Sequence, residues 1–109
     1  MELNNYQKEA HRTARYVDIG EAYVYPTLGL VGEAGELANK VKKIFRDRDG
    51  KIDEETKNAL MLELGDILWY VAEIATVLGV PLEEVAEANL QKLASRKERE
   101  VIGGSGDNR

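Results

Sequence analysis

The sequence predicts an all-α fold in which four helices form a bundle. Three observations carry this prediction. Apolar residues recur at steps of three and four along extended stretches, glycine and proline separate these stretches, and the length of 109 residues suits one domain. We expect residues 1–102 to form this single helical domain, and residues 103–109, which are rich in glycine, to form a flexible tail.

The first two helices are predicted in the N-terminal half. The first runs from about Leu3 to Tyr16, and the segment from Val17 to Pro26 is a connection. The second begins at Pro26 or Thr27, since a proline in the first helical turn loses no hydrogen bond. Its apolar residues are spaced so that they share one face. These residues are Leu30, Ala34, Leu37, Val41 and Ile44.

Three glycines lie inside the second helix, at positions 29, 32 and 35. Each glycine costs a helix about 1 kcal/mol relative to alanine. We therefore expect another helix or a ligand to approach the backbone closely along this stretch.

The third and fourth helices follow a turn at residues 46–51. The third begins near Asp53, a good N-cap residue, and ends at Leu78 before Gly79, a typical C-cap. Pro81 opens the fourth helix, which ends before Gly103. The third helix carries a sustained apolar seam of the kind that packs in bundles. This seam consists of Leu60, Leu64, Ile67, Val71, Ile74 and Leu78.

Composition narrows the possible functions. The net charge of -5 argues against binding of nucleic-acid polymers, which require a basic surface. The absence of cysteine excludes disulfides, zinc–thiolate sites and a cysteine nucleophile. No apolar run is long enough to cross a membrane, and the first ten residues contain no signal core. We therefore expect a cytoplasmic protein with no membrane partner.

Four carboxylates stand beside the apolar faces of the second and third helices. Glu63 and Asp66 are three residues apart among leucines and isoleucine, and Glu33 and Glu36 repeat this spacing. Like charges at this spacing destabilise a helix, and partial burial adds to the cost. If the two pairs face each other, they form an oxygen cage for a hard cation such as Mg²⁺. A solvated acidic surface is the alternative interpretation of either pair alone.

A ferritin-like di-iron site is disfavoured. Such sites need a histidine three residues after a glutamate on each of two helices. His11 is the single histidine in the chain, and no carboxylate precedes it at that spacing.

The paired acidic motif resembles the signature of the MazG-like, all-alpha nucleoside triphosphate pyrophosphohydrolases. The motif reads E33-x-x-E36, then 26 residues, then E63-x-x-D66. The flanking segments GLVGEAGELANKVKK at 29–43, ELGDILWYVAEIATVLGV at 63–80 and EEVAEANLQKLASRK at 83–97 are also similar to that family. The resemblance extends over most of the chain, from about Tyr6 to Lys97.

This resemblance implies that a nucleoside triphosphate is hydrolysed to a monophosphate and pyrophosphate. It implies that Glu33, Glu36, Glu63 and Asp66 are the catalytic acids and bind Mg²⁺, for which Mn²⁺ substitutes. One acid, such as Glu36, would act as general base through a bound water. The expected role is housekeeping of the nucleotide pool, in which unwanted ribo- or deoxyribonucleotides, including non-standard ones, are removed. The preferred base and sugar stay open.

Six further residues are predicted to contact substrate. Lys40 and Lys43 continue the acidic stripe and could meet phosphates, although helical pairing with Glu36 explains them equally well. Tyr70 lies one turn beyond Asp66. The resemblance also places an asparagine, a lysine and an arginine of the fourth helix at the substrate, and these are Asn89, Lys92 and Arg96.

Two other residues have structural interpretations. We expect Trp69 to lie in the core or an interface, with base stacking as the alternative. We expect His11 to be a surface residue.

Apolar residues outside the main seam of the third helix, such as Leu62 and Leu68, indicate oligomerisation. Together with the resemblance they predict a homotetramer built as a dimer of dimers, with a homodimer as the alternative, and active sites near subunit interfaces. Two other functions are left open. One is a phosphoribosyl-ATP pyrophosphohydrolase-like activity, and the other is a non-catalytic helical-bundle interaction protein.

Overall fold

The structure is a computed structural model that describes residues 1–99. Four helices occur in this part of the chain: α1 (Leu3–Arg12), α2 (Val24–Arg48), α3 (Glu54–Leu78) and α4 (Leu82–Glu98). Residues 1–99 contain no strand, so the all-α class with four helices is confirmed. None of these helices is long and apolar enough to cross a membrane. The predicted tail at 103–109 lies outside the described residues.

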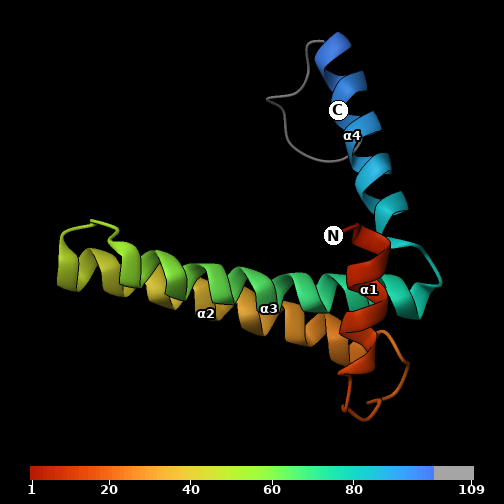
Figure 1. Cartoon of the computed structure of the whole chain (residues 1–109), viewed down its shortest axis with the longest axis horizontal. Coiled ribbons are helices and arrows are strands. Elements are labelled where there is room, and N and C mark those ends of the chain that lie inside the picture. Colours follow the sequence, from red (N-terminus) through yellow and green to blue (C-terminus); the bar gives the residue numbers. More distant parts are fainter. Residues whose placement is uncertain (100–109) are drawn as a thin grey trace.

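The helices are arranged around one long antiparallel pair. Figure 1 shows α2 and α3 running side by side along most of the molecule, with α1 crossing one end of this pair. The fourth helix leaves α3 at the same end and extends away from the pair. The α2–α3 pair is therefore the main scaffold, and its central part carries the acidic motif.

Helix α1 is shorter than predicted and α2 is longer. The first helix ends at Arg12, where the Thr13 hydroxyl donates to the carbonyl of Ala10 over 2.7 Å and completes the last turn. The second begins at Val24, before the proline, and continues to Arg48. It ends only where Asp49 adopts a left-handed backbone conformation, with φ of 53°. Apolar periodicity alone does not locate such ends, because hydrogen bonds at the caps decide them.

The predicted ends of α3 are confirmed. Asp53 forms a capping box with Thr56, in which the Asp53 side chain accepts the Thr56 backbone N–H over 2.8 Å. At the other end, Gly79 has a φ of 72°, a conformation that glycine adopts without strain. These two signals are local in the sequence, and they were therefore readable from it.

The buried core is small and lies where α1 and α4 meet the end of α3. Its buried residues are Ala72, Ala75 and Leu82, and Tyr6 and Val71 pack against them. The apolar seam predicted on α3 is only partly covered, since Leu64 and Leu78 are 55% and 63% exposed. Much of the apolar surface that the sequence assigns to helix packing therefore stays open within one chain.

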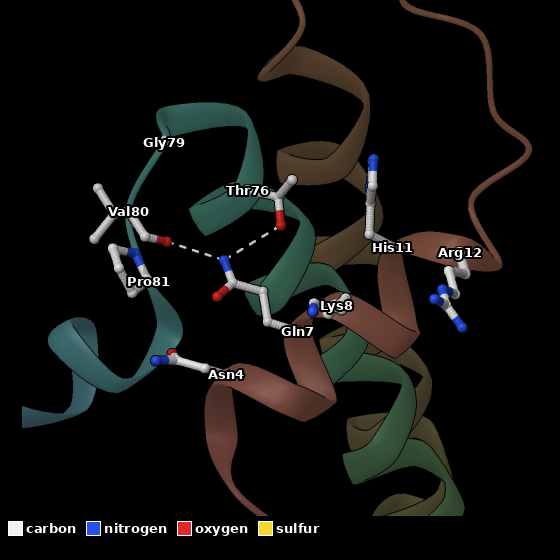
Figure 2. A pocket seen from close by; sticks show the side chains of 9 residues that line it. All are labelled: Asn4, Gln7, Lys8, His11, Arg12, Thr76, Gly79, Val80 and Pro81. Carbon is white, nitrogen blue, oxygen red and sulfur yellow. Dashed lines mark hydrogen bonds between the residues drawn. The ribbon is translucent and has the colours of Figure 1, made fainter.

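Helix α4 is capped by side chains of α1 rather than by its own N-cap residue. Pro81 makes no capping hydrogen bond, but the backbone N–H of Leu82 donates to Gln7 Oε1 over 2.7 Å. The N–H of Glu83 donates to Asn4 Oδ1 over 3.0 Å. Figure 2 shows Gln7 also donating to the carbonyl of Val80. These bonds fix the start of α4 against α1.

Candidate metal centre

The acidic motif meets across the α2–α3 pair. Glu33 of α2 and Glu63 and Asp66 of α3 each offer a carboxylate oxygen, and the three oxygens lie within 4.8 Å of one another. This grouping follows from antiparallel packing, because it brings the midpoints of two helices of equal length together. The three-residue spacing on α3 then points both of its acids towards α2.

The fourth predicted ligand, Glu36, is not part of this cluster. It lies one turn further along α2 and is exposed. Its negative charge still acts on Glu33 and is one of the causes that raise the pKa of that residue. Glu36 therefore lies beside the cluster at an exposed position of α2.

The electrostatics of the cluster favour a positive ligand. Desolvation raises the pKa of Glu33 first of all, and a hydrogen bond with Glu63 and the charges of Asp66, Glu63 and Glu36 raise it further. Glu63 Oε2 is buried and has no hydrogen-bond partner in the described part of the chain. An unpartnered buried carboxylate oxygen is costly, so a cation beside it would relieve the cost.

The donor set suits a hard divalent cation. All three clustered groups are carboxylates, and oxygen ligands of this kind are those that Mg²⁺ and Mn²⁺ take in proteins. No histidine belongs to the cluster and the chain has no cysteine, so the ligands typical of zinc and copper sites are missing from this group. The residues that are present therefore fit Mg²⁺.

Lys40 supplies the one cationic contact to this cluster among the ion pairs of the described residues. Its Nζ lies 3.3 Å from Glu63 Oε1, and the two side chains are 37% and 12% exposed. The alternative expectation, pairing of Lys40 with Glu36 along α2, does not occur within the ion-pair distance. Lys40 thus bridges the two helices at the edge of the acidic cluster.

Lys40 and Lys43 both line a cavity of about 280 Å³ that adjoins this edge. The cavity extends between α2 and α3 towards their connecting turn, where Arg48 adds a third basic residue and Asp47 an acidic one. Leu60 of α3 also lines it. The two lysines predicted to meet phosphates therefore share one cavity.

Tyr70 lies on the opposite side of the acidic cluster. Desolvation raises its pKa, and Tyr25 and the charges of Glu33 and Asp66 raise it further. Its ring fits against α2 because position 29 is glycine: a Cβ on Gly29 would overlap the ring. The close approach expected at the glycines is thus made by Tyr70 at Gly29, whereas Gly32 meets nothing within 4 Å.

Trp69 is half-buried beside Tyr70 and packs against α1, which agrees in part with the core interpretation. Its indole N–H donates to the Thr13 hydroxyl over 2.8 Å and to the Ala10 carbonyl over 3.2 Å. Its ring meets Tyr16 and Tyr70 edge to face. These contacts tie α1 to α3.

The residues predicted on α4 stand apart from the acids within one chain. Asn89 and Lys92 are exposed and line a cavity of about 460 Å³ with Glu84, Val85 and Ala88, and none of the four predicted site acids lines that cavity. Figure 1 shows α4 extending away from the α2–α3 pair. Arg96 is only 3% exposed, so it is not a solvated residue at the end of α4.

Sequence reasoning missed a buried carboxylate of α3 that lies two helical turns beyond Asp66. Glu73 is fully buried, and it accepts hydrogen bonds from His11 Nδ1 over 3.0 Å and from the Tyr16 hydroxyl over 2.9 Å. Burial of Tyr16 is the largest cause, and its hydrogen bond to Glu73 the second, that raise the pKa of Tyr16 to about 12. His11 is at the surface as expected, with a side chain 58% exposed, but it also anchors α1 to α3.

The cavity in Figure 2 does not belong to the metal centre. It measures about 550 Å³ and is formed by α1 and the α3–α4 turn, with Lys8, His11 and Arg12 on its α1 side. None of the predicted site residues lines it. We assign it to the α1–α4 junction described above.

Comparison with known proteins identifies the same family that the acidic motif resembles. Residues 26–101, which include all four predicted acids, match the MazG nucleotide pyrophosphohydrolase domain. The chain belongs to the MazG nucleotide pyrophosphohydrolase family. The match covers α2, α3 and α4, so the metal centre lies inside the MazG domain. MazG proteins are typically metal-dependent hydrolases, in keeping with the acidic cluster.

Two relatives have similar sequences. The chain is 54% identical to the Gene 37 protein of Mycobacterium phage L5, over the full length of both chains. It is 40% identical to the uncharacterized protein YvdC of Bacillus subtilis over 74 residues, which cover 63% of this MazG chain and 70% of YvdC. No solved structure matches the chain.

Proposed function

We propose that this MazG protein hydrolyses nucleoside triphosphates to nucleoside monophosphates and pyrophosphate in a Mg²⁺-dependent reaction. The observation that carries the proposal is the convergence of Glu33, Glu63 and Asp66 within 4.8 Å, in a chain of the nucleotide pyrophosphohydrolase family. The role that fits is housekeeping of the nucleotide pool. The expected substrates are ribo- or deoxyribonucleoside triphosphates, including non-standard ones.

The chain's own residues would divide the work around the metal centre. Glu33, Glu63 and Asp66 would hold Mg²⁺ or Mn²⁺, which neutralises phosphate charge and lowers the pKa of a bound water. Glu36, which is exposed beside the cluster, would accept a proton from such a water and so act as the general base. Its exposed carboxylate is free of the three-acid cluster, which supports a role different from that of the other acids.

The surroundings of the acids indicate an orientation for the substrate. Lys40 and Lys43 lie on the side of the connecting turn, where their charges would attract the leaving phosphates. Tyr70 lies on the other side, where its ring would contact the sugar or α-phosphate. The phosphate chain would therefore extend towards the α2–α3 turn and the nucleoside towards α1.

We further propose that the active enzyme is a homotetramer, or a homodimer, in which α4 of one chain completes the site of another. Apolar side chains on α2 and α3 are exposed within one chain, among them Leu28, Val31 and Leu62 at 61%, 66% and 68%. Burial of such side chains stabilises association. Because Asn89 and Lys92 line their cavity with Glu84, Val85 and Ala88 and not with the four predicted site acids, a partner chain offers them a route to the substrate.

The proposed metal centre is tested by removing charge while keeping shape. In Glu63→Gln and Asp66→Asn, we expect a folded protein that is no longer stabilised by Mg²⁺ and that hydrolyses substrate slower by orders of magnitude. Glu55→Gln is a matched control, because Glu55 lies on the same helix, is 84% exposed and is outside the cluster. Thermal unfolding with and without Mg²⁺, together with pyrophosphate release, measures both effects. Near-normal turnover in both variants would refute the proposed site.

A further inference from the structure

Lys40 connects two neighbouring parts of the site that carry opposite charge. On one side its Nζ contacts Glu63, which belongs to the acidic cluster. On the other side it lines the cavity that also contains Lys43 and Arg48. One side chain thus reaches a proposed metal ligand and the proposed phosphate cavity.

From this position, and resting on the function proposed above, we infer that Lys40 is a place-holding cation that serves two partners in turn. In the metal-free protein it neutralises Glu63. When a divalent cation takes the carboxylates, Lys40 leaves Glu63 and binds a β- or γ-phosphate of the substrate in the adjoining cavity. The transfer changes the partner of an ammonium group and involves no proton or bond.

Electrostatics explains why Lys40 would leave Glu63. A divalent cation on the three carboxylates carries more charge than an ammonium group, and the two would repel each other strongly at one carboxylate inside a partly desolvated site. Lys40 occupies Glu63 Oε1, whereas Glu63 Oε2 is buried and has no hydrogen-bond partner among the described residues, so Oε2 would be the oxygen left for such a cation. The metal and the lysine therefore compete for one side chain through different oxygens.

The side chain of Lys40 is suited to such a move. Lysine has a flexible four-carbon stem with a compact charge, and Lys40 is 37% exposed, so the head can turn without unpacking the core. The cavity beside it measures about 280 Å³, which is large enough for a phosphate group, and Lys43 lies one turn further along its wall. A phosphate there would meet two ammonium groups in succession.

The inference predicts opposite effects of one substitution on two ligands. In Lys40→Met, Mg²⁺ alone should bind at least about threefold more tightly, since a competing charge is gone. Magnesium pyrophosphate, the proposed product, should bind about tenfold more weakly, since a charge-assisted phosphate contact is lost. Substitution of a residue with a purely structural role would weaken the binding of both ligands or of neither.

The test is isothermal titration of the full chain, first with Mg²⁺ alone and then with magnesium pyrophosphate. Lys40→Gln serves as a second neutral variant, and Lys40→Arg, which keeps the charge, should restore Mg²⁺ affinity to the wild-type value. Lys42→Met is the matched control on the same helix, because Lys42 is exposed and lines none of the cavities described above. It should change neither affinity.

The outcomes separate this inference from the proposed function. Unchanged or weaker Mg²⁺ binding in both neutral variants would overturn the place-holding role. Tighter Mg²⁺ binding with unchanged binding of magnesium pyrophosphate would overturn the transfer to phosphate. Failure of the wild-type protein to bind Mg²⁺ would instead overturn the proposed function itself.

Discussion

At the scale of single residues, the acidic cluster is held together against its own repulsion. Three carboxylates lie within 4.8 Å, and one ammonium group, that of Lys40, partly compensates them. Glu33 responds by keeping its proton more readily than an ordinary glutamate, because its raised pKa follows from desolvation and from neighbouring acids. The fold therefore holds mutually repelling carboxylates together at a place where a bound cation would reduce their repulsion.

This raised pKa predicts how pH affects the metal-free protein. A carboxyl group with a pKa higher in the folded than in the unfolded state makes folding less favourable as pH rises through the interval between the two values. In Glu33→Gln this penalty is absent, so the variant should be more stable than the wild type at neutral pH without metal. The difference should shrink as pH falls to the ordinary pKa of glutamate.

Urea unfolding with a chelator present, repeated across pH 4 to 8 in roughly half-unit steps, measures the difference. Glu55→Gln, an exposed acid on α3, should show no comparable gain. Two results would contradict the raised pKa of Glu33. In one, Glu33→Gln is less stable than the wild type at neutral pH. In the other, the difference in free energy of unfolding between them is the same at every pH.

The sequence predicted the acidic residues because their type and spacing are local. Glu63 and Asp66 are recognisable from the apolar residues around them. Glu73 has the same chemistry, but its partners His11 and Tyr16 lie about sixty positions away. Their contact depends on how α1 crosses α3, which no local pattern encodes. The available sign that Glu73 is buried is its place in the sequence, where an acid stands between the apolar residues Ala72 and Ala75.

At the scale of the elements, the α2–α3 pair positions the site, and its register depends on Tyr70. The ring of Tyr70 occupies the space left by the missing side chain of Gly29. Helix α3 could be predicted from end to end because both caps are local, whereas α1 and α2 end at contacts that involve backbone carbonyls and a left-handed Asp49. The position of α4 depends on capping by Asn4 and Gln7, far away in sequence.

The close packing at Gly29 predicts opposite effects of two equivalent substitutions. Gly29→Ala should lower the free energy of unfolding by about 1–3 kcal/mol, since the added methyl group must displace the Tyr70 ring. Gly32→Ala, on the same helix, meets open space and should raise it by up to about 1 kcal/mol through better helix propensity. Chemical denaturation compares them directly. Equal effects of the two substitutions would show that the ring does not rest on Gly29.

At the scale of the whole molecule, one chain has a small buried core and leaves many apolar side chains exposed. The extents are 43 × 42 × 30 Å for a chain with only a small buried core, because α4 extends away from the α2–α3 pair. The sequence predicted four helices correctly, but their periodicity does not say whether an apolar face meets the same chain or another one. The exposed seam residues Leu64 and Leu78 are the visible result.

This exposure predicts an oligomer in dilute solution. Multi-angle light scattering should give the mass of four chains, or of two in the alternative assembly, rather than 12.2 kDa. Leu62→Asp, which places a charge at a 68% exposed apolar position, should shift the protein towards monomers and reduce hydrolysis together with assembly. A stable wild-type monomer with full activity would contradict the proposal that chains complete each other's sites.

The central claim is the position of bond cleavage, and analysis of the products tests it most directly. The protein is incubated with Mg²⁺ and a panel of natural and modified nucleoside triphosphates, and phosphorus NMR follows the products. We expect pyrophosphate and nucleoside monophosphate to appear in equal amounts, and Asp66→Asn to abolish both. Release of orthophosphate with a nucleoside diphosphate would contradict it.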